Sequence, residues 1–550
     1  MLFLLFVYGL VVSPVAYPNA DSLSSVTLQQ ALIGDAAQSC VSLPTLRSTS
    51  LQTALIQLYQ NNDYKTLWEG AQQRAALKTE LEQLVDDGLS PEDYGFALQA
   101  RPPVKQCDEL RISSQYLLAL EHLSRGRLAQ ADHEPYWQAN ALPPPSAPLL
   151  SELALTGLRK GIAASFEQAR PALPQYRALR AAYAAMDRQP ASRAPLPPGP
   201  VLRPGMSDER IEQLAAQLQQ DGFLLESPAA YVSVSNYNGA LVEAVRLYQA
   251  QHGLQVDGII GPLTLTALNI SPAQRVQQVR INLERLRWVN AQRSDYLLLI
   301  NVASARLQLM RGNDTLWRAR AQVGRSSRPT PLLVSYINRI TLNPGWTVPP
   351  TILREDILPK IRRNPDYLGV HNLRTLDTQG KPLDPRHIDW NNPRGIILRQ
   401  PPGPTNPLGE IVFRLPNPFS IYLHDTPSKH LFQQTNRSVS SGCVRVENAN
   451  ELAAQLFAGL SFLEHEHIAQ QRASKQTHEI ALTNGPRVIL AYWTAFANSE
   501  GQLAFVADSY GLDQALVSAM AIMPAPKPAA KAPIAVPAEA GCAVYDRAPS

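Results

Sequence analysis

The chain has 550 residues and a nearly balanced charge, with 50 lysines and arginines against 46 aspartates and glutamates and a formal net charge of +4. A single hydrophobic core rarely grows beyond about 250–300 residues, so the chain is expected to fold into several domains. No dense basic run interleaved with aromatic residues is present, so nucleic acid is not an expected partner.

The first residues read MLFLLFVYGLVVSPVA, an apolar run that Ser13 and Pro14 interrupt before it could comfortably span a bilayer. Small residues follow at Ala16 and Ala20, as in a secretory signal. Residues 1–20 are therefore predicted to be a signal peptide or, since no positive charge precedes the apolar run, an uncleaved N-terminal anchor. Export is expected, with membrane contact only through this segment if it stays uncleaved.

Residues 25–188 are rich in Ala, Leu, Gln and Arg, with apolar residues three and four positions apart, and are predicted to form a helical domain. The prolines of QPASRAPLPPGPVLRPG indicate an extended linker over residues 189–205. Residues 206–269 are predicted to be a compact unit of short helices. Residues 270–290 are predicted to form one helix that returns to the first domain.

The compact unit ends in GLQVDGIIGPLTLTALN, whose glycines supply turn geometry. This unit resembles the peptidoglycan-binding-like module, a three-helix bundle. The residues that carry the resemblance are Val245, Tyr248, Gln249, Gly253, Leu254, Asp257, Gly258, Gly261 and Thr264. A small bundle that only spaces other domains would share the same core pattern, so this alternative stays open.

Residues 293–500 alternate with a period of two and are predicted to form a β-rich domain. Within it, the Pro-rich and loop-rich insertion 351–407 suits a mobile lid over the site better than a core layer. GRSSRPTP, residues 324–331, lacks the GK[ST] of a phosphate loop and is interpreted as a β turn beside the active site. Residues 501–522 form a C-terminal extension, and the Ala/Pro-rich tail 523–550 is predicted to be disordered.

The four cysteines, Cys40, Cys107, Cys443 and Cys542, show no CxxC spacing for zinc, and HEH at 465–467 lacks the spacing of HExxH. No metal or other cofactor is therefore expected. In an oxidising compartment Cys40 and Cys107 could pair, which would leave Cys443 as a thiol in a turn rich in serine and glycine.

Residues 422–448, YLHDTPSKHLFQQTNRSVSSGCVRVEN, combine Cys443 with two histidines. A thiol attacks an acyl carbon as its thiolate, so catalysis needs a base within reach and donors for the oxyanion that forms. Gly442 permits a tight or left-handed turn that could aim the N–H groups of Gly442 and Cys443 at one point, as an oxyanion hole. The hydroxyls of Ser440 and Ser441 could hold this turn.

The base is expected to be His424 rather than His430. In FSIYLHD, strand alternation places Tyr422 and His424 on the same face, and the loop 425–439 is long enough to bring Cys443 beside them. His430 lies instead in PSKHLFQ, a predicted helical turn. From these residues alone the competing interpretation is strong, because an isolated cysteine or histidine more often serves packing than chemistry.

The stretch from His424 to Arg445, which ends in SSGCVR, resembles the signature of the L,D-transpeptidase catalytic domain of the YkuD type. His424 matches the base of that family and Cys443 its nucleophile. The flanking positions of the signature are matched by Ser440, Gly442 and Arg445. The commonest form of the signature has histidine directly before Gly-Cys, where this sequence has Ser441.

Further matches point to the large YcbB-like branch of this family: NPGW with Trp346, the insertion before Tyr422, PTNPLG around Asn406, and YWTA from Tyr492. The resemblance implies an exported, periplasmic protein with three parts. These are an α-helical scaffold, a small three-helix peptidoglycan-binding-like bundle, and a β-rich (α+β) catalytic domain with a capping insertion.

The activity that the resemblance implies is formation of 3→3 crosslinks between peptide stems of the bacterial wall, through an acyl-enzyme on Cys443. Peptide stems are the implied partners, with other cell-wall enzymes as further ones, and carbapenems are expected to acylate the same thiol. Two alternatives stay open: a wall-binding scaffold with an idle catalytic domain, and a hydrolase that uses the same acyl-enzyme.

The residues expected to bind substrate are Tyr422, Arg445, Trp346, Ser440 and Ser441. Arg445 would meet a stem carboxylate bidentately, or else hold the turn through a salt bridge. Tyr422 and Trp346 would line the acyl pocket, or else be core aromatics.

Overall fold

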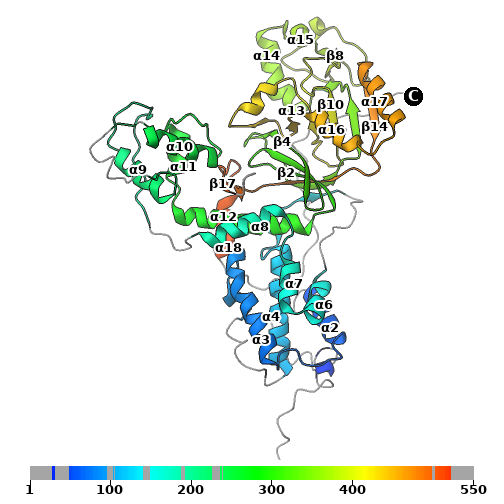
Figure 1. Cartoon of the computed structure of the whole chain (residues 1–550). Helices are drawn as coiled ribbons and strands as arrows, with labels where there is room; N and C mark the ends of the chain where they lie inside the picture. Colours follow the sequence, from blue (N-terminus) through cyan, green and yellow to red (C-terminus); the bar gives the residue numbers. More distant parts are fainter. Residues whose placement is uncertain are drawn as a thin grey trace, which may run out of the picture.

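The structure, a computed structural model, describes most of the chain (Figure 1). The described residues are 28–30, 32, 49–95, 103, 106–139, 149–186, 192–225, 236–237, 239–497 and 502–521. The predicted signal segment 1–20, the tail 523–550, Cys40 and Cys542 lie outside these residues. Cys107 is disulfide-bonded. Across the described residues, no helix combines the length and the apolar character needed to cross a membrane.

The N-terminal region, blue to cyan in Figure 1, is the predicted helical scaffold. Its helices are α2 (Thr49–Gln60), α3 (Ala71–Gln83), η3 (Leu84–Asp87), η4 (Pro91–Tyr94), α4 (Gln106–Arg125), α5 (Gln130–His133), α6 (Leu150–Lys160), α7 (Ile162–Ala169) and α8 (Pro174–Ala185). Helix α4 is central because Leu117, Leu120 and Leu123 on its inner face are fully buried. Trp68 packs in the same core and donates from Nε1 to Ser113 Oγ at 2.7 Å.

The second unit consists of α9 (Ile211–Gln220), α10 (Gly239–Gln251) and α11 (Pro262–Leu268), as the sequence predicts. Gln249 organises its glycine-rich turn from the buried side of α10. The Gln249 amide nitrogen donates to the Ile259 carbonyl at 2.9 Å, and its oxygen accepts from the N–H groups of Asp257 and Gly258 at 3.1 and 2.9 Å. One buried side chain therefore fixes the turn that carries the resemblance.

The described part of the predicted linker 189–205 is extended and packs along the second unit. Leu196 and Leu202 are buried in the core of this bundle, at 3% and 1% exposure. Leu202 also exchanges backbone hydrogen bonds with Ile260. The prolines keep the segment extended, and its leucines bind it to the bundle.

Helix α12 (Pro272–Ala291) lies where the three parts meet, next to α8 and α18 (Asp513–Ala521) in Figure 1. Ser271 and Gln274 form a capping box at its start. It packs against α4 and α8 of the scaffold, which confirms the predicted return. Arg285 and Arg287 on this helix are fully buried, which requires partners from the surrounding elements.

The predicted C-terminal extension 501–522 is integrated into the fold rather than appended to it. Strand β17 (Leu503–Phe505) pairs antiparallel with β16 (Ala495–Ala497). Helix α18 packs on α12 through Leu516 and Met520, each 1% exposed.

His252 at the end of the bundle is stacked between two aromatic rings, Tyr248 at 3.7 Å and Phe505 of β17 at 5.4 Å between centroids. Burial, and secondarily Arg275, lower its pKa from 6.5 to about 3. The unfolded chain therefore binds a proton below about pH 6.5 that the folded chain excludes down to about pH 3, so stability is lost as the pH falls through this window.

Acidification from pH 7.5 to 5 is accordingly expected to lower the melting temperature of the wild type more than that of His252→Gln. Other acid-sensitive groups are shared by both proteins and cancel in the comparison. Equal decreases in differential scanning calorimetry would show that His252 does not carry this effect.

The third unit is built on one large mixed sheet with the strand order β1-β5-β15-β2-β3-β4-β13-β11-β10-β6-β14, and β12 pairs with β4. Its strands are β2 (Tyr296–Asn301), β3 (Arg306–Arg311), β4 (Asp314–Gly324), β5 (Leu333–Tyr336), β6 (Arg339–Leu342), β10 (Ile411–Arg414), β11 (Leu423–His424), β12 (Ser438–Ser440), β13 (Val444–Val446), β14 (His478–Ala481) and β15 (Arg487–Ala491). Helices α16 (Ala449–Phe457) and α17 (Phe462–Ala473) follow β13. The β-rich third domain is therefore confirmed.

Strand β1 (Trp137–Gln138) is a short strand within the predicted helical N-terminal domain. It pairs parallel with β5, with Trp137 opposite Leu333, and so adds a scaffold segment to the edge of the large sheet. Two residues are too few to show a period of two in sequence, and the strand is completed by a partner almost 200 residues away.

The insertion 351–407 contains more regular structure than its loop-rich sequence predicts, and its role as a lid stays a prediction. Its elements are α13 (Pro350–Ile352), the π-helical segment η7 (Leu353–Ile357), α14 (Leu358–Arg363), α15 (Tyr367–Val370), β8 (Arg374–Leu376), η8 (Pro385–His387) and β9 (Ile397–Gln400), with β7 (Trp346–Thr347) pairing β9. Ile357, Ile361, Leu368 and Leu398 form part of its own core. In Figure 1 its helices α14 and α15 lie at the top of the third unit. The prolines separate its short elements. They also make the composition typical of a loop, so the sequence did not indicate this core.

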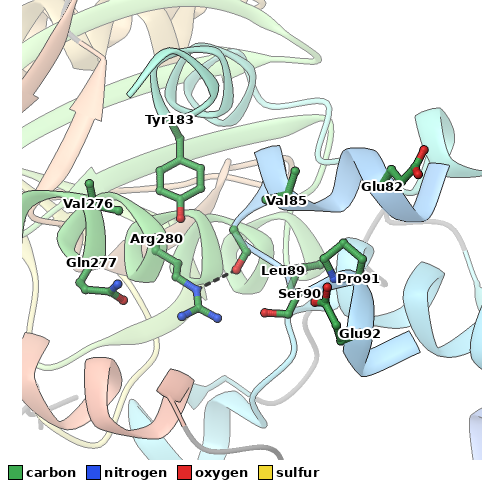
Figure 2. Close-up of a pocket in the computed structure, with 11 residues that line it drawn as sticks. Glu82, Val85, Leu89, Ser90, Pro91, Glu92, Tyr183, Val276, Gln277 and Arg280 are labelled. Carbon is green, nitrogen blue, oxygen red and sulfur yellow. Dashed lines mark hydrogen bonds between the residues drawn. The ribbon is translucent and has the colours of Figure 1, made fainter. Parts of the chain in front are cut away.

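A cavity of about 600 Å³ lies between the scaffold and α12, away from the cysteine (Figure 2). Figure 2 shows Tyr183 of α8 and Arg280 of α12 on one side and Glu92 on the other. Arg280 Nε donates to the Gly88 carbonyl at 2.9 Å, so the arginine joins the two parts. This lining contains no thiol or histidine and belongs to the domain junction.

Candidate active site

Strands β11 and β13 bring the two halves of the motif together. They pair parallel, with Leu423 opposite Val444 and His424 opposite Arg445. The Val444 N–H donates to the Tyr422 carbonyl at 3.2 Å, so the pairing extends one residue toward Cys443. Because side chains alternate along both strands, Tyr422, His424, Cys443 and Arg445 share one face of the sheet.

The turn before the nucleophile is held by short hydrogen bonds. Gly442 has φ 116°, a conformation that side chains other than hydrogen disfavour. Ser440 Oγ donates to the Cys443 carbonyl at 2.6 Å and accepts from the Gly442 N–H at 3.1 Å. Thr330 Oγ1 donates to the Gly442 carbonyl at 2.7 Å. The prediction that Ser440 holds this turn is confirmed.

The same geometry bears on the predicted oxyanion hole, which stays a prediction. The Gly442 N–H already donates to Ser440 Oγ, so it does not point to an open position. The Ser440 hydroxyl, two residues earlier, accepts the Gly442 N–H, a donor for which the sequence alone indicates no partner. Gly442 therefore serves first as the residue that permits the turn.

Cys443 carries a reduced thiol and is 7% exposed. Its Sγ lies 3.9 Å from the Ser420 carbonyl, a weak contact in which sulfur is the donor. Ser420 itself has φ 53°, an uncommon value for a residue other than glycine. The thiol is thus placed in a narrow, largely desolvated position.

His424 is 4% exposed and stands edge-on to Tyr422, with ring centroids 5.6 Å apart. Its Nδ1 lies 2.5 Å from the Asp425 carbonyl oxygen. Burial, followed by the charge of Arg445, lowers its pKa from 6.5 to about 3, although the Asp425 and Leu408 carbonyls oppose this shift. The ring is therefore neutral at working pH and can accept a proton.

His430 is exposed on the 3-10 turn η9 (Lys429–Gln433). It is therefore on the helical turn that the sequence predicts, and it does not lie on the face shared with Cys443. Of the two histidines in the motif, His424 is the one that the fold places on that face.

Arg445 is oriented by a residue that sequence reasoning missed. Its Nη1 donates to Gln322 Oε1 on β4 at 2.9 Å, and Nε is buried without a hydrogen-bond partner among the described residues. Burial lowers the pKa of the guanidinium, and the Cys443 side chain raises it in part. Among the described residues Arg445 joins no ion pair, so the salt-bridge alternative is wrong.

The two aromatic residues expected in the acyl pocket differ in exposure. Tyr422 is 6% exposed, and the Arg414 guanidinium lies 5.7 Å from its ring centroid. Trp346 on β7 is half-buried and packs against both the sheet core and the core of the insertion. Trp346 therefore joins the insertion to the sheet.

Ser441 does not hold the turn as predicted; its hydroxyl faces two arginines. It accepts from Arg328 Nη1 at 3.0 Å and from Arg325 Nη1 at 3.4 Å. These arginines come from the segment interpreted as a turn beside the site, and their carboxylate partners, Glu355 and Asp356, belong to the insertion. The two arginines of RSSR, residues 325–328, are the sequence feature that could have indicated this contact.

Comparisons with known proteins give matches for three segments of the chain. Residues 295–461 match the family described as "L,D-transpeptidase catalytic domain" (YkuD), residues 53–182 match "Scaffold domain", and residues 207–268 match "Putative peptidoglycan binding domain". A Haemophilus influenzae protein named "Putative L,D-transpeptidase" is 36% identical over 241 residues, which are 43% of this chain and 48% of that protein. The match spans about half the length of this relative.

Two solved structures are similar over parts of the chain. An L,D-transpeptidase from Mycobacterium smegmatis is 14% identical over 36% of this chain and 59% of that one, with a TM-score of 0.17. An L,D-transpeptidase from Xylanimonas cellulosilytica is 15% identical over 54% of this chain and 99% of that one, with a TM-score of 0.16. TM-scores this low do not show a shared overall arrangement. Residues 295–461 match the YkuD family of L,D-transpeptidases, and two other segments match a scaffold domain and a peptidoglycan-binding domain.

Proposed function

We propose that this protein is a cysteine L,D-transpeptidase that forms 3→3 crosslinks between peptide stems of bacterial peptidoglycan. The observation that carries the proposal is the shared face of Cys443, His424 and Arg445 on the paired strands β11 and β13, inside the matched domain. The peptidoglycan-binding domain supports a wall substrate. A cell-wall enzyme acts outside the cytoplasm, and we place this one in the periplasm.

In the first half-reaction, His424 takes the proton of the Cys443 thiol as the sulfur attacks the carbonyl of the diamino acid in a tetrapeptide stem. The C–N bond to the terminal D-alanine breaks, the leaving amine takes a proton from His424, and a thioester remains. In the second, the side-chain amine of another stem attacks the thioester, His424 accepts its proton, and the thiol is restored. The Cys443 N–H would hold the oxyanion, joined by Gly442 once Ser440 Oγ releases its N–H.

Arg445 would assist by stabilising the thiolate rather than by binding a stem. The low pKa of His424 disfavours a resting imidazolium, so the negative charge on sulfur needs another counter-charge. Arg445 provides one, because it shares the face of Cys443, interacts with it electrostatically and is held there by Gln322.

Replacing this charge is expected to slow alkylation of Cys443. Arg445→Gln should react with iodoacetamide about tenfold more slowly at neutral pH, because loss of a nearby cation raises the pKa of a thiol. Arg445→Lys keeps the charge and should retain much of the rate. The pH dependence of alkylation measures both variants, and equal losses in the two would point to a packing role instead.

Product analysis tests the function itself. Wild-type enzyme and purified disaccharide-tetrapeptide muropeptides should give 3→3 crosslinked dimers and released D-alanine, and Cys443→Ala should give neither. Tripeptide products without dimers would identify a hydrolase. Absence of any product from a folded wild-type protein, with unreactive Cys443, would identify an idle domain on a wall-binding scaffold.

A further inference from the structure

The turn between β4 and β5 is fixed directly against the turn that presents the nucleophile. The Arg325 N–H donates to the Ser440 carbonyl at 3.1 Å, and Thr330 Oγ1 donates to the Gly442 carbonyl at 2.7 Å. Both ends of the segment are thereby tied to residues adjoining Cys443. The side chains of Arg325 and Arg328 meet at the Ser441 hydroxyl, two residues before the thiol.

These two arginines already hold carboxylates, which come from the insertion. Arg328 binds Asp356 through two parallel contacts, Nη1 to Oδ2 at 2.6 Å and Nη2 to Oδ1 at 3.2 Å, and it also contacts Glu355. Arg325 Nη2 lies 3.7 Å from Asp356 Oδ1. The two-point contact is the geometry in which guanidinium recognises carboxylate specifically.

Arg328 and its carboxylate partners differ in accessibility, whereas Arg325, 36% exposed, is as open as Asp356. The Arg328 side chain is 14% exposed, whereas Asp356 and Glu355 are 35% and 43% exposed. Both acids lie in the π-helical segment of the insertion, a local irregularity common at functional sites. Partly exposed ion pairs exchange readily for solvent or for another carboxylate. Arg328 is therefore held in the catalytic domain, whereas another carboxylate can replace those of Glu355 and Asp356.

We propose that Arg325 and Arg328 bind the C-terminal carboxylate of the donor stem, and that Glu355 and Asp356 occupy this position when no stem is bound. The inference rests on the proposed transpeptidase function and names the recognition site for its donor. In a tetrapeptide stem this carboxylate carbon lies three bonds, about 4 Å, from the carbonyl that Cys443 attacks. A binding stem displaces the insertion from the arginines.

The test compares two synthetic donors, a tetrapeptide stem with a C-terminal carboxylate and the same stem with a C-terminal amide. Wild-type enzyme should prefer the acid, and Arg328→Gln should raise KM for the acid about tenfold or more while changing that for the amide little. Arg328→Lys should recover part of the loss. Glu355→Gln/Asp356→Asn should lower KM for the acid, whereas Asp384→Asn, a half-buried acid elsewhere in the insertion, should not.

Iodoacetamide labelling of Cys443 and melting temperatures are measured in every variant. Unchanged labelling in Arg328→Gln separates loss of donor recognition from damage to the thiol. Equal losses for acid and amide, or equal use of both by the wild type, would overturn the assignment. An unchanged KM in the Glu355/Asp356 variant would show that the insertion does not compete with the stem for the two arginines. Wild-type protein that processes neither stem would instead refute the proposed function, and the inference would fall with it.

Discussion

His424→Ala is expected to slow acylation of Cys443 by roughly 10²- to 10⁴-fold, the range typical of a positioned acid–base group. His424 shares the face of Cys443 on the paired strands, and its ring is neutral at working pH because burial and Arg445 lower its pKa to about 3. Without it, no group takes the proton in the second half-reaction or returns it to the leaving amine. Single-turnover acylation by a tetrapeptide donor measures this rate.

His430→Ala provides the matched control, because His430 belongs to the same loop but is exposed on η9. It should acylate at the wild-type rate, and both variants should melt near the wild-type temperature. A large loss confined to His430→Ala would mean that the base has been assigned to the wrong histidine.

Arg285→Ala is expected to destabilise the protein by about 3–5 kcal/mol, because it leaves buried carboxylates without their counter-charge. Arg285 on α12 is fully buried and donates to Glu134 at 2.6 and 2.8 Å and to Asp513 at 2.6 Å. This cluster joins the scaffold segment, α12 and α18 beneath the catalytic sheet. Urea unfolding, followed by tryptophan fluorescence, measures the change.

The decrease in unfolding free energy caused by Arg285→Ala should be smaller at pH 5 than at pH 7. Burial raises the pKa of Glu134, so this carboxylate can bind a proton once Arg285 is gone. Arg386→Ala is the control: its pair with Asp384 is 85% exposed on the arginine side and should contribute little. Similar destabilisation by both substitutions would refute the idea that the buried cluster joins the domains.

The parts of the site that could be predicted from sequence are those set by local rules. Alternation in FSIYLHD is sufficient to place Tyr422 and His424 on one face, and the glycine in SSGC is sufficient to indicate an unusual turn. The loop between His424 and Cys443 is long enough for the strands to pair, and they do so in parallel.

The parts that sequence reasoning missed depend on partners distant in the chain. Nothing near Arg445 indicates that Gln322, more than 120 residues earlier, orients it. The two-residue strand β1 exists only because β5 completes it. The carboxylates of Glu355 and Asp356 meet Arg328 only after the insertion has folded around its own core.

The resting partner of the Gly442 N–H was missed for a different reason. Gly442 could be predicted to adopt a special conformation, but the destination of its N–H depends on the rotamer of Ser440, which accepts it at 3.1 Å. Backbone propensity does not determine such competition between a side chain and a substrate for one donor.

Intact-mass spectrometry of the protein treated with a carbapenem tests the central claim, an acyl-enzyme on Cys443, most directly. A strained lactam carbonyl needs only a thiolate and an oxyanion donor, and the resulting thioester should persist long enough to detect. The wild type should gain the mass of one carbapenem, mapped by peptide digestion to Cys443, and Cys443→Ala should gain none. An adduct of the same mass in Cys443→Ala, or its location at another residue in the wild type, would contradict the account.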